Sequence, residues 1–425
     1  MPLKEAQQKR PRGADKRKLK ERSILRLIHS GFNISRFELA RKTGVSPASI
    51  TAIVKRLIKN GIVVEAAASR SSLGRRPVPL EIRAEVAYLV GVDIGSYYLR
   101  TLVTDINGNV VCRHQTETAL SEGRDRVLKK TIQNVHGLIK KSGLLTASIK
   151  GIGIAHSGII DSQKGVVLSF PRPGQLAEWK NIPLKALFEK EFGVPCLLED
   201  SVRTAAAAES RFGLGKSLND FLYIDVGMGI GAAIFFDGKL YRGKGGKAGE
   251  FGHITVDENG PLCSCGNNGC LETVASCAAI IRAARTAVEH GVDSTIVDLA
   301  GGNVDKISIE LIAQAAAEKD SVAFRVLQGA ASYIAAGLAD LINILNPVQI
   351  IFGGALFRAA PQLLSDPFQR IIRQRTIQQL SNDVQLMVSS LDGGASALGA
   401  SRLIAESILD DISIGSRRTA RQYDK

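Results

Sequence analysis

The chain of 425 residues lacks the usual marks of a secreted protein and of a membrane protein. Its six cysteines are too few for a disulfide scaffold at this length. No apolar run reaches the roughly 18 to 20 residues of a membrane span, and the nearest, over residues 221–236, contains Asp225 and several glycines. No apolar segment follows the charged first residues, so the signature of a signal peptide is missing. We therefore expect a soluble, cytoplasmic protein with no membrane partner.

Acidic residues are scarce in one part of the chain. The first 85 residues contain 20 Lys and Arg against 7 Asp and Glu, whereas the rest contains 35 against 34. A protein that only needs to stay in solution would scatter its charge, so a basic module attached to a neutral body indicates a polyanion partner for the module. A basic tail without a partner is the alternative.

Three predicted helices occupy the basic segment. The first, over residues 16–30, carries leucine and isoleucine on one stripe. The second is short, because Ser35 and Glu38 have the spacing of a capping box and Gly44 supplies a left-handed stop. Two helices joined through a short glycine turn are typical of a helix-turn-helix.

The third predicted helix is the candidate for insertion into DNA. It follows Ser46 as N-cap, starts at Pro47 and ends at Gly61. Its apolar residues recur at helical spacing and must face the core, which leaves a small, polar and basic face outside. Small residues permit close approach to a major groove, and hydroxyl groups reach base edges. The residues of this segment that we expect to contact DNA are Ser46, Ser49, Thr51 and Lys55.

A wing is predicted over residues 62–82, as two short strands around a loop. The loop presents Arg75 and Arg76 in an extended stretch stiffened by proline, which can lie along a narrow, A·T-rich minor groove. A solvated hairpin tip is the alternative. Aromatic residues are scarce in the module, which disfavours stacking on single strands. We therefore expect residues 1–85 to form a winged helix-turn-helix domain that binds double-stranded DNA.

From about residue 86 the pattern changes to strands alternating with helices, and it repeats itself. A strand, a glycine turn and a second strand open the segment, and residues 221–238 follow the same plan. Two such units predict a duplicated α/β fold that holds phosphates between its halves with glycine amides, although either turn could be a tight hairpin. A further pair, Gly353 and Gly354, could seat an adenosine. The expected phosphate-loop residues are Asp93, Gly95, Gly227 and Gly229.

The sharpest local signal is one imidazole and three thiols within 18 residues. This set predicts a closed tetrahedral Zn²⁺ site without a position for water, so the ion would be structural. Gly266 and Gly269 allow the tight backbone path that such a site needs. Coincidental clustering, or a disulfide with a spare cysteine, is the alternative. The expected ligands are His253, Cys263, Cys265 and Cys270.

Two acidic residues, Glu250 and Glu272, bracket the predicted zinc site. Carboxylates beside a metal site are suited to accepting hydrogen bonds from the hydroxyl groups of a polyol, so these two residues are candidates for sugar binding. Simple surface charge is the alternative.

These motifs together are similar to those of the ROK family of repressors, open reading frames and kinases. The resemblance covers nearly the whole chain, including the helix-turn-helix and the Gly-Arg-Arg-Pro wing, and it points to the repressor branch. It implies an actin-like sugar-kinase fold, with phosphate loops at 93–96 and 227–231. It also implies sugar contacts from Glu250, His253 and Glu272, with His253 binding zinc as well.

The chain departs from the family kinases at the general base. The kinases carry an Asp in an E-N-D-A-N stretch, and alignment on Glu199 and Glu209 places Ser201 there and Asp200 one position earlier. A serine hydroxyl cannot take a proton near neutral pH, so the loss would be about 3 to 5 kcal/mol of transition-state stabilisation. A slip of one residue would instead make Asp200 the base. Ser96–Tyr97 and Met228 also replace usual phosphate-loop residues of the kinases.

The prediction is therefore a sugar-responsive DNA-binding repressor that has lost kinase activity, with Asp200 as a further candidate sugar contact. It would bind a palindromic operator with A·T-rich flanks as a homodimer or a dimer of dimers. The alternatives are an ATP-dependent hexose kinase that also binds DNA, and a constitutive DNA-binding protein whose body only dimerises it. Beyond the DNA-binding domain, the expected parts are a small lobe over 86–205 completed by 395–410, a large lobe over 206–394, and a polar tail over 411–425.

Overall fold

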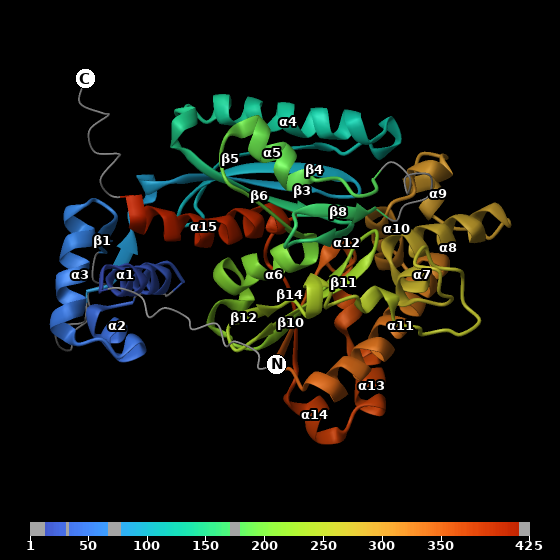
Figure 1. The fold of residues 1–425 in the computed structure, drawn as a ribbon. Coiled ribbons are helices and arrows are strands. Elements are labelled where there is room, and N and C mark those ends of the chain that lie inside the picture. Colours follow the sequence, from blue (N-terminus) through green and yellow to red (C-terminus); the bar gives the residue numbers. More distant parts are fainter. Residues whose placement is uncertain (1–12, 31–33, 67–77, 171–178, 416–425) are drawn as a thin grey trace, which may run out of the picture.

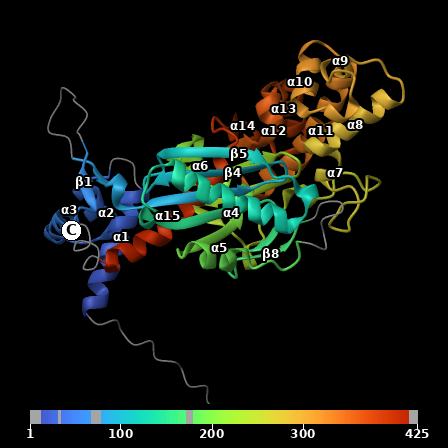
Figure 2. The same ribbon diagram turned by 90° about the horizontal axis from the view of Figure 1, so that it is seen from above.

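The computed structural model describes residues 13–30, 34–66, 78–170 and 179–415. It places a small helical module beside a larger α/β body, and the long helix α15 (Ala395–Gly415) runs from the body to the module (Figure 1). The view from above shows the same arrangement (Figure 2). The predicted class, a helix-turn-helix module followed by an α/β body, is confirmed.

The module contains the three predicted helices and the two strands of the wing. They are α1 (Gly13–Ser30), α2 (Arg36–Thr43), α3 (Pro47–Lys59) and the antiparallel pair β1 (Val63–Glu65) and β2 (Leu80–Ile82). The tip of the wing, with Arg75 and Arg76, lies outside the described residues.

The helix ends in the module follow the predicted capping chemistry. The carboxylate of Glu38 accepts a hydrogen bond from the backbone N–H of Ser35 at 2.8 Å. In return, the Ser35 hydroxyl accepts one from the backbone N–H of Glu38 at 3.3 Å. Gly44 ends α2 with a φ of 65°, in the left-handed region. Ser46 caps α3, which ends at Lys59, just before the predicted stop at Gly61. Local sequence therefore sets these boundaries.

The module shares a hydrophobic core with the body. Ile24 and Ile28 of α1 are buried in one cluster with Ile404 and Ile408 of α15. Figures 1 and 2 both show α1 beside this end of α15. The Nε2 atom of His29 also lies 2.8 Å from the carbonyl oxygen of Ile106 in the body. The module is therefore packed onto the body and is not merely tethered to it.

The first half of the body is built on a five-stranded sheet in the order β5-β4-β3-β6-β9. The pairs β3–β4 and β4–β5 are antiparallel, and β3–β6 and β6–β9 are parallel. Its strands are β3 (Tyr88–Ile94), β4 (Tyr98–Asp105), β5 (Val110–Glu117), β6 (Ile149–His156) and β9 (Cys196–Asp200). The flanking elements are α4 (Arg124–Lys141), β7 (Ile159–Asp161), β8 (Val166–Ser169) and α5 (Leu184–Phe192).

The second half repeats the same sheet. Its order is β12-β11-β10-β13-β14, again with two antiparallel pairs followed by two parallel pairs. Its strands are β10 (Phe221–Val226), β11 (Ile230–Phe236), β12 (Lys239–Tyr241), β13 (Gln349–Gly353) and β14 (Gln385–Val388). The equal topology confirms the predicted duplication.

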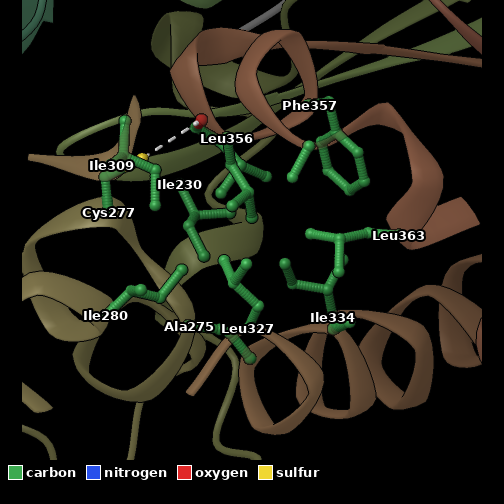
Figure 3. Close-up of a cluster of buried hydrophobic side chains, with 14 of the residues drawn as sticks. Ile230, Ala275, Cys277, Ile280, Ile309, Leu327, Ile334, Leu356, Phe357 and Leu363 are labelled. Atoms are coloured by element: carbon green, nitrogen blue, oxygen red, sulfur yellow. Dashed lines mark hydrogen bonds between the residues drawn. The ribbon is translucent and has the colours of Figure 1, made fainter. Parts of the chain in front are cut away.

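Helices cover the outer side of the second sheet. Figure 3 shows side chains of α8, α10, α11 and α12 pointing toward one another in the buried core of this half. The helices are α7 (Leu271–Ala275), α8 (Cys277–Glu289), α9 (Ile296–Leu299), α10 (Ile309–Ala317), α11 (Ser321–Leu345), α12 (Gly354–Ala359), α13 (Asp366–Arg375) and α14 (Gln378–Asp383). Among the described helices, α11 alone has the length and composition of a membrane span. However, 56% of its apolar 18-residue stretch is buried inside the protein.

Two helices, α15 and α6 (Ser201–Phe212), lie between the sheets. They pack closely, because Gly399 of α15 faces the carbonyl oxygen of Thr204 so nearly that a Cβ there would lie 1.7 Å from it. α15 also packs on β3 and β6, and α6 on β11. The predicted boundary between the small and the large lobe, between residues 205 and 206, falls inside α6. This predicted boundary therefore does not coincide with the end of a helix or strand.

Candidate ligand cavity and metal centre

A cavity of about 390 Å³ opens where the two sheets face each other. Its walls come from the carboxyl ends of β3, β6, β9, β10 and β13 and from the loops that follow them. This is the usual place for a ligand in an open α/β sheet, because loops there converge on one space.

The four predicted sugar contacts all line this cavity: Asp200, Glu250, His253 and Glu272. The Nε2 atom of His253 lies 4.0 Å from a carboxylate oxygen of Glu250. Glu272, on α7, accepts the backbone N–H of Ile230 at 3.0 Å, which leaves its second oxygen for a ligand. Burial and the nearby Asp200 raise the pKa of Glu250. Four residues that are up to 72 positions apart in sequence are thus in one cavity.

The predicted metal ligands also come together. The donor atoms of His253, Cys263, Cys265 and Cys270 all lie within 4.8 Å of one another. The Cys265 and Cys270 sulfurs are 3.6 Å apart, as are the Cys263 sulfur and the His253 Nδ1 atom. A tetrahedron with metal–sulfur distances of about 2.3 Å has edges of about 3.8 Å. The cluster therefore fits a tetrahedral metal ion.

The backbone around the metal ligands depends on glycine. Gly269 has a φ of 61°, and a Cβ at this position would lie 1.5 Å from the carbonyl oxygen of Asp257. No other residue allows this close approach, so the loop returns Cys270 to the other ligands. Cys270 is the N-cap residue of α7, which carries Glu272 into the cavity.

His253 connects the metal cluster to the cavity. Its Nδ1 atom faces the thiol of Cys263, and its Nε2 atom faces Glu250 on the cavity side. A metal ion on Nδ1 would fix the ring and keep the proton on Nε2, which is then a donor for a ligand hydroxyl.

Asp200 and Ser201 lie at the start of α6, and both line the cavity. One oxygen of Asp200 accepts the backbone N–H groups of Val202 and Arg203 at 2.9 and 3.0 Å. The Ser201 hydroxyl lies 3.2 Å from that of Ser157. Burial raises the pKa of Asp200, although Arg203 opposes this. The Asp200 carboxylate is thus held as a helix cap.

A buried ion-pair network beside the cavity was not predicted. Glu199 is 2% exposed and binds Arg203 at 2.9 Å and Arg242 at 2.7 Å. Arg203 also donates to the carbonyl oxygen of Ala248 at 3.2 Å, next to Glu250. Burial alone would raise the pKa of Glu199, but the two arginines hold it below its usual value. An arginine within an alanine-rich helix was the only sequence signal for this network.

The predicted phosphate loops form a second part of the cavity wall, which we call the loop end. Gly95, Gly227, Gly229 and Gly354 line it, together with Asp93. Gly353 does not; it belongs to β13, and a Cβ there would lie 1.9 Å from the hydroxyl oxygen of Tyr223.

Arg100 of β4 was missed by the sequence reasoning. Its Nη1 atom lies 3.3 Å from Asp93, and its side chain lines the cavity. Burial raises the pKa of Asp93 to about 6, although Arg100 opposes the shift. Tyr97 and Tyr98 line the same end, and only Tyr97 was noted from the sequence, as a departure from the kinase pattern.

The predicted DNA-binding residues of the helix α3 segment lie on its outer side. Ser46, Ser49 and Lys55 are exposed, and Thr51 is half-buried. The Ser46 hydroxyl caps the helix and donates to the Ser49 hydroxyl at 2.9 Å. The opposite face of α3, with Ile50, is buried.

The family follows from comparison with known proteins. The model of the ROK family matches residues 89–407, and that of winged helix-turn-helix DNA-binding domains matches residues 17–64. The chain belongs to the ROK family. This ROK protein is 31% identical over 387 residues to the xylose repressor of Caldicellulosiruptor bescii, an alignment that covers 91% of the chain and 95% of the relative.

Solved structures agree with the whole architecture. A ROK family transcriptional regulator, described as a homologue of the Escherichia coli Mlc protein, superimposes with a TM-score of 0.76 at 28% identity, over 94% of this chain and 98% of that one. A ROK family glucokinase from Streptomyces griseus, solved with glucose and AMPPNP, superimposes with a TM-score of 0.67 at 31% identity. The match covers 75% of this chain and 99% of the glucokinase chain. The ROK body is thus common to a regulator and an enzyme, whereas the DNA-binding module distinguishes this chain from the kinase.

Proposed function

We propose that this ROK protein is a sugar-responsive transcriptional repressor of the cytoplasm that binds its ligand without phosphorylating it. The observation that carries the proposal is the position of α6. The helix begins at Ser201 in the cavity, and Arg211 in its last turn donates to the carbonyl oxygen of Ser30 in the DNA-binding module at 3.2 Å. One rigid element thus touches both the ligand site and the module.

The module provides the contact with DNA. The exposed face of α3 enters a major groove, with Ser49, Thr51 and Lys55 toward the bases and phosphates. Arg75 and Arg76 of the wing follow the adjacent A·T-rich minor groove. Because two recognition helices must lie about 34 Å apart for a palindromic operator, the active form is a homodimer or a dimer of dimers.

The zinc-side end of the cavity provides the sugar contacts. Carboxylates of Asp200, Glu250 and Glu272 accept hydroxyl hydrogens, and His253 donates from Nε2. A structural Zn²⁺ ion on His253, Cys263, Cys265 and Cys270 would hold this wall in place. Since a relative is named a xylose repressor, xylose is the first sugar to test.

The absence of a general base makes the site a sensor. Ser201 stands at the position of the kinase aspartate, and its neutral hydroxyl is too weak a base to accept the sugar proton near neutral pH. The Oδ1 atom of Asp200, one position earlier, accepts two backbone N–H groups and caps α6, and we assign the Asp200 carboxylate to sugar binding. The former nucleotide positions in this view are Asp93, Gly95, Gly227, Gly229 and Gly354.

The coupling between sugar and DNA would run along the two inner helices. A sugar that contacts Asp200 favours one position of α6, and α6 packs on α15, which supports α1. A ligand can shift this equilibrium only by its difference in affinity for the two positions. Such couplings are typically about 1 to 3 kcal/mol, or 5-fold to 150-fold in operator affinity.

The test is an operator titration followed by fluorescence anisotropy, with and without saturating xylose, glucose or N-acetylglucosamine. At least one sugar should change operator affinity by 5-fold or more, and Glu250→Gln should abolish the change. Glu258→Gln, which removes an exposed carboxylate outside the cavity, is the matched control and should respond fully. No response to any sugar would contradict the proposal.

A kinase that also binds DNA is the second candidate, and the glycines of both phosphate loops favour it. Release of ADP from ATP, in the presence of these sugars and Mg²⁺, distinguishes a kinase from a repressor without kinase activity. We expect no release above background, and turnover at an ordinary enzymatic rate would establish the kinase.

A further inference from the structure

The loop end of the cavity departs from the site for a nucleotide and its Mg²⁺ ion that the fold would imply. Such an ion binds to carboxylate oxygens, and one of the two oxygens of Asp93, Oδ2, is already paired with Arg100 at 3.3 Å. Arg100 is itself held by Gln115, which accepts its Nε–H at 2.9 Å. A guanidinium group therefore already supplies the positive charge beside Asp93.

The charge of the lining also disfavours an anionic ligand. Six carboxylate side chains face three guanidinium groups in the described lining of the cavity. The residues are Asp93, Asp200, Asp225, Glu250, Glu272 and Glu310 against Arg100, Arg203 and Arg358. A phosphorylated or acidic sugar would lose favourable hydration and meet net repulsion, whereas a neutral polyol would find hydrogen-bond acceptors.

Two exposed tyrosines line this end of the cavity. Tyr97 is 56% exposed and Tyr98 is 41% exposed, and their ring centroids lie 6.3 Å apart. Their backbone is fixed, because the Tyr97 carbonyl accepts from Thr118 at 2.8 Å and the Tyr98 carbonyl accepts from Gly95 at 3.2 Å. The guanidinium of Arg100 lies 4.9 Å from the Tyr98 ring and holds it from one side. The tyrosines thus form a preorganised aromatic surface with polar edges.

One buried acceptor at this end has no partner. Asp93 is 3% exposed and lines the cavity, but its Oδ1 atom has no hydrogen-bond partner among the described residues. A buried carboxylate oxygen without a donor is costly, so it indicates a group that the ligand supplies. A hydroxyl group would satisfy it without a change of charge.

We propose that the loop end is a second sugar subsite, and that the effector is an uncharged sugar of at least two units. This inference rests on the proposed function and names the class of its ligand. The first unit binds at Asp200, Glu250, His253 and Glu272. The second unit stacks on Tyr97 and Tyr98 and donates a hydroxyl hydrogen to Asp93 Oδ1. The space once suited to a nucleotide is thus used by the same sugar that the zinc-side end holds.

The test is calorimetry on the full chain with three pairs of probes: glucose and cellobiose, xylose and xylobiose, and N-acetylglucosamine and chitobiose. In at least one pair the disaccharide should bind at least 10-fold more tightly than its monosaccharide. Tyr97→Ala should reduce this ratio to within 2-fold and leave the monosaccharide affinity unchanged, while Tyr97→Phe should preserve the ratio. Tyr241→Ala is the matched control, because Tyr241 is 55% exposed and lies outside the cavity.

The outcomes separate this inference from the function on which it rests. If monosaccharides bind and disaccharides bind no more tightly, or if Tyr97→Ala leaves the ratio unchanged, the second subsite is wrong and the sensor remains. If AMPPNP with Mg²⁺ binds and competes with the disaccharide, the loop end has kept its nucleotide and the inference is overturned. If no sugar of any pair binds, the proposed function fails and the inference fails with it.

Discussion

The two halves of the body are built on the same sheet, but their surroundings differ. In the first half, glycines on β3 and β6 let α15 approach: a Cβ on Gly91 would lie 2.0 Å from the Ala397 carbonyl oxygen, and one on Gly153 would lie 1.9 Å from that of Ala400. In the second half, β13 carries large side chains such as Phe352, and its cover is a thick layer of helices. The first half is therefore shaped to hold the helix that supports the DNA-binding module.

The loops that follow the first strand of each half differ in the same way. The loop after β10 contains Gly227 and Gly229, whereas Tyr97 lies in the loop after β3 and Tyr98 begins β4. The metal cluster belongs to the second half alone. In the proposed function, the second half holds three of the four sugar contacts, and the first half carries Asp200 and supports the DNA-binding module.

Removing the metal should have the largest effect and should act through the second half. Cys263→Ser removes one of four ligands, so the ion is lost together with its contribution to folding and the orientation of His253. We expect loss of bound zinc, loss of sugar binding and a clearly lower melting temperature. Elemental analysis measures the bound zinc, calorimetry measures sugar binding, and thermal unfolding measures the melting temperature. Cys112→Ser, outside the cluster, should change none of them.

Closing the space between β6 and α15 should come next and should act through the first half. In Gly153→Ala the added Cβ meets a backbone carbonyl, which cannot move aside, so we expect a loss of about 3 kcal/mol in unfolding free energy. Chemical denaturation measures it. Gly137→Ala on α4 has open space and should instead stabilise the protein by up to about 1 kcal/mol. Equal effects of the two changes would contradict the close packing of α15.

Mild acid should weaken the contact between the module and the first half through His29. Burial lowers the pKa of His29 to about 4, whereas the unfolded chain has the ordinary value of 6.5. Because the unfolded state takes up a proton first, this contribution to stability is complete above pH 6.5 and declines as the pH falls toward 4. The loss at pH 5 should be about 2 kcal/mol.

Denaturation of the wild type and His29→Gln between pH 7 and 5 checks this prediction. Glutamine has no titratable group and can still donate to the Ile106 carbonyl, so the variant should lose less stability over this range. Parallel pH profiles of the two proteins would show that His29 does not titrate as described.

Arg211→Ala should have the smallest effect on stability but a specific effect on coupling. The change removes the contact between the last turn of α6 and Ser30. We expect the sugar-induced change in operator affinity to shrink by about 1 kcal/mol, or roughly 5-fold, with sugar affinity unaltered. Arg113→Ala, at an exposed ion pair with Asp392, is the control. A full response in Arg211→Ala would place the coupling elsewhere.

Local chemistry was predictable from the sequence, and long-range packing was not. The capping box of Ser35 and the metal ligands depend on short spacings, so the sequence contains them directly. The network of Glu199, Arg203 and Arg242 and the role of Arg100 depend on contacts between distant elements, which a single sequence does not record. The shared core of the module and α15 escaped prediction for the same reason, because it joins the two ends of the chain.

In the proposed function, the ligand cavity and the DNA-binding module share one conformational equilibrium. The most direct measurement is the affinity of one bound sugar for the free protein and for the operator-bound protein, by calorimetry at one salt concentration. Linkage requires that the two affinities differ by the same factor, about 5-fold or more, by which the sugar changes operator affinity. Equal sugar affinity in the presence and absence of operator would contradict the account.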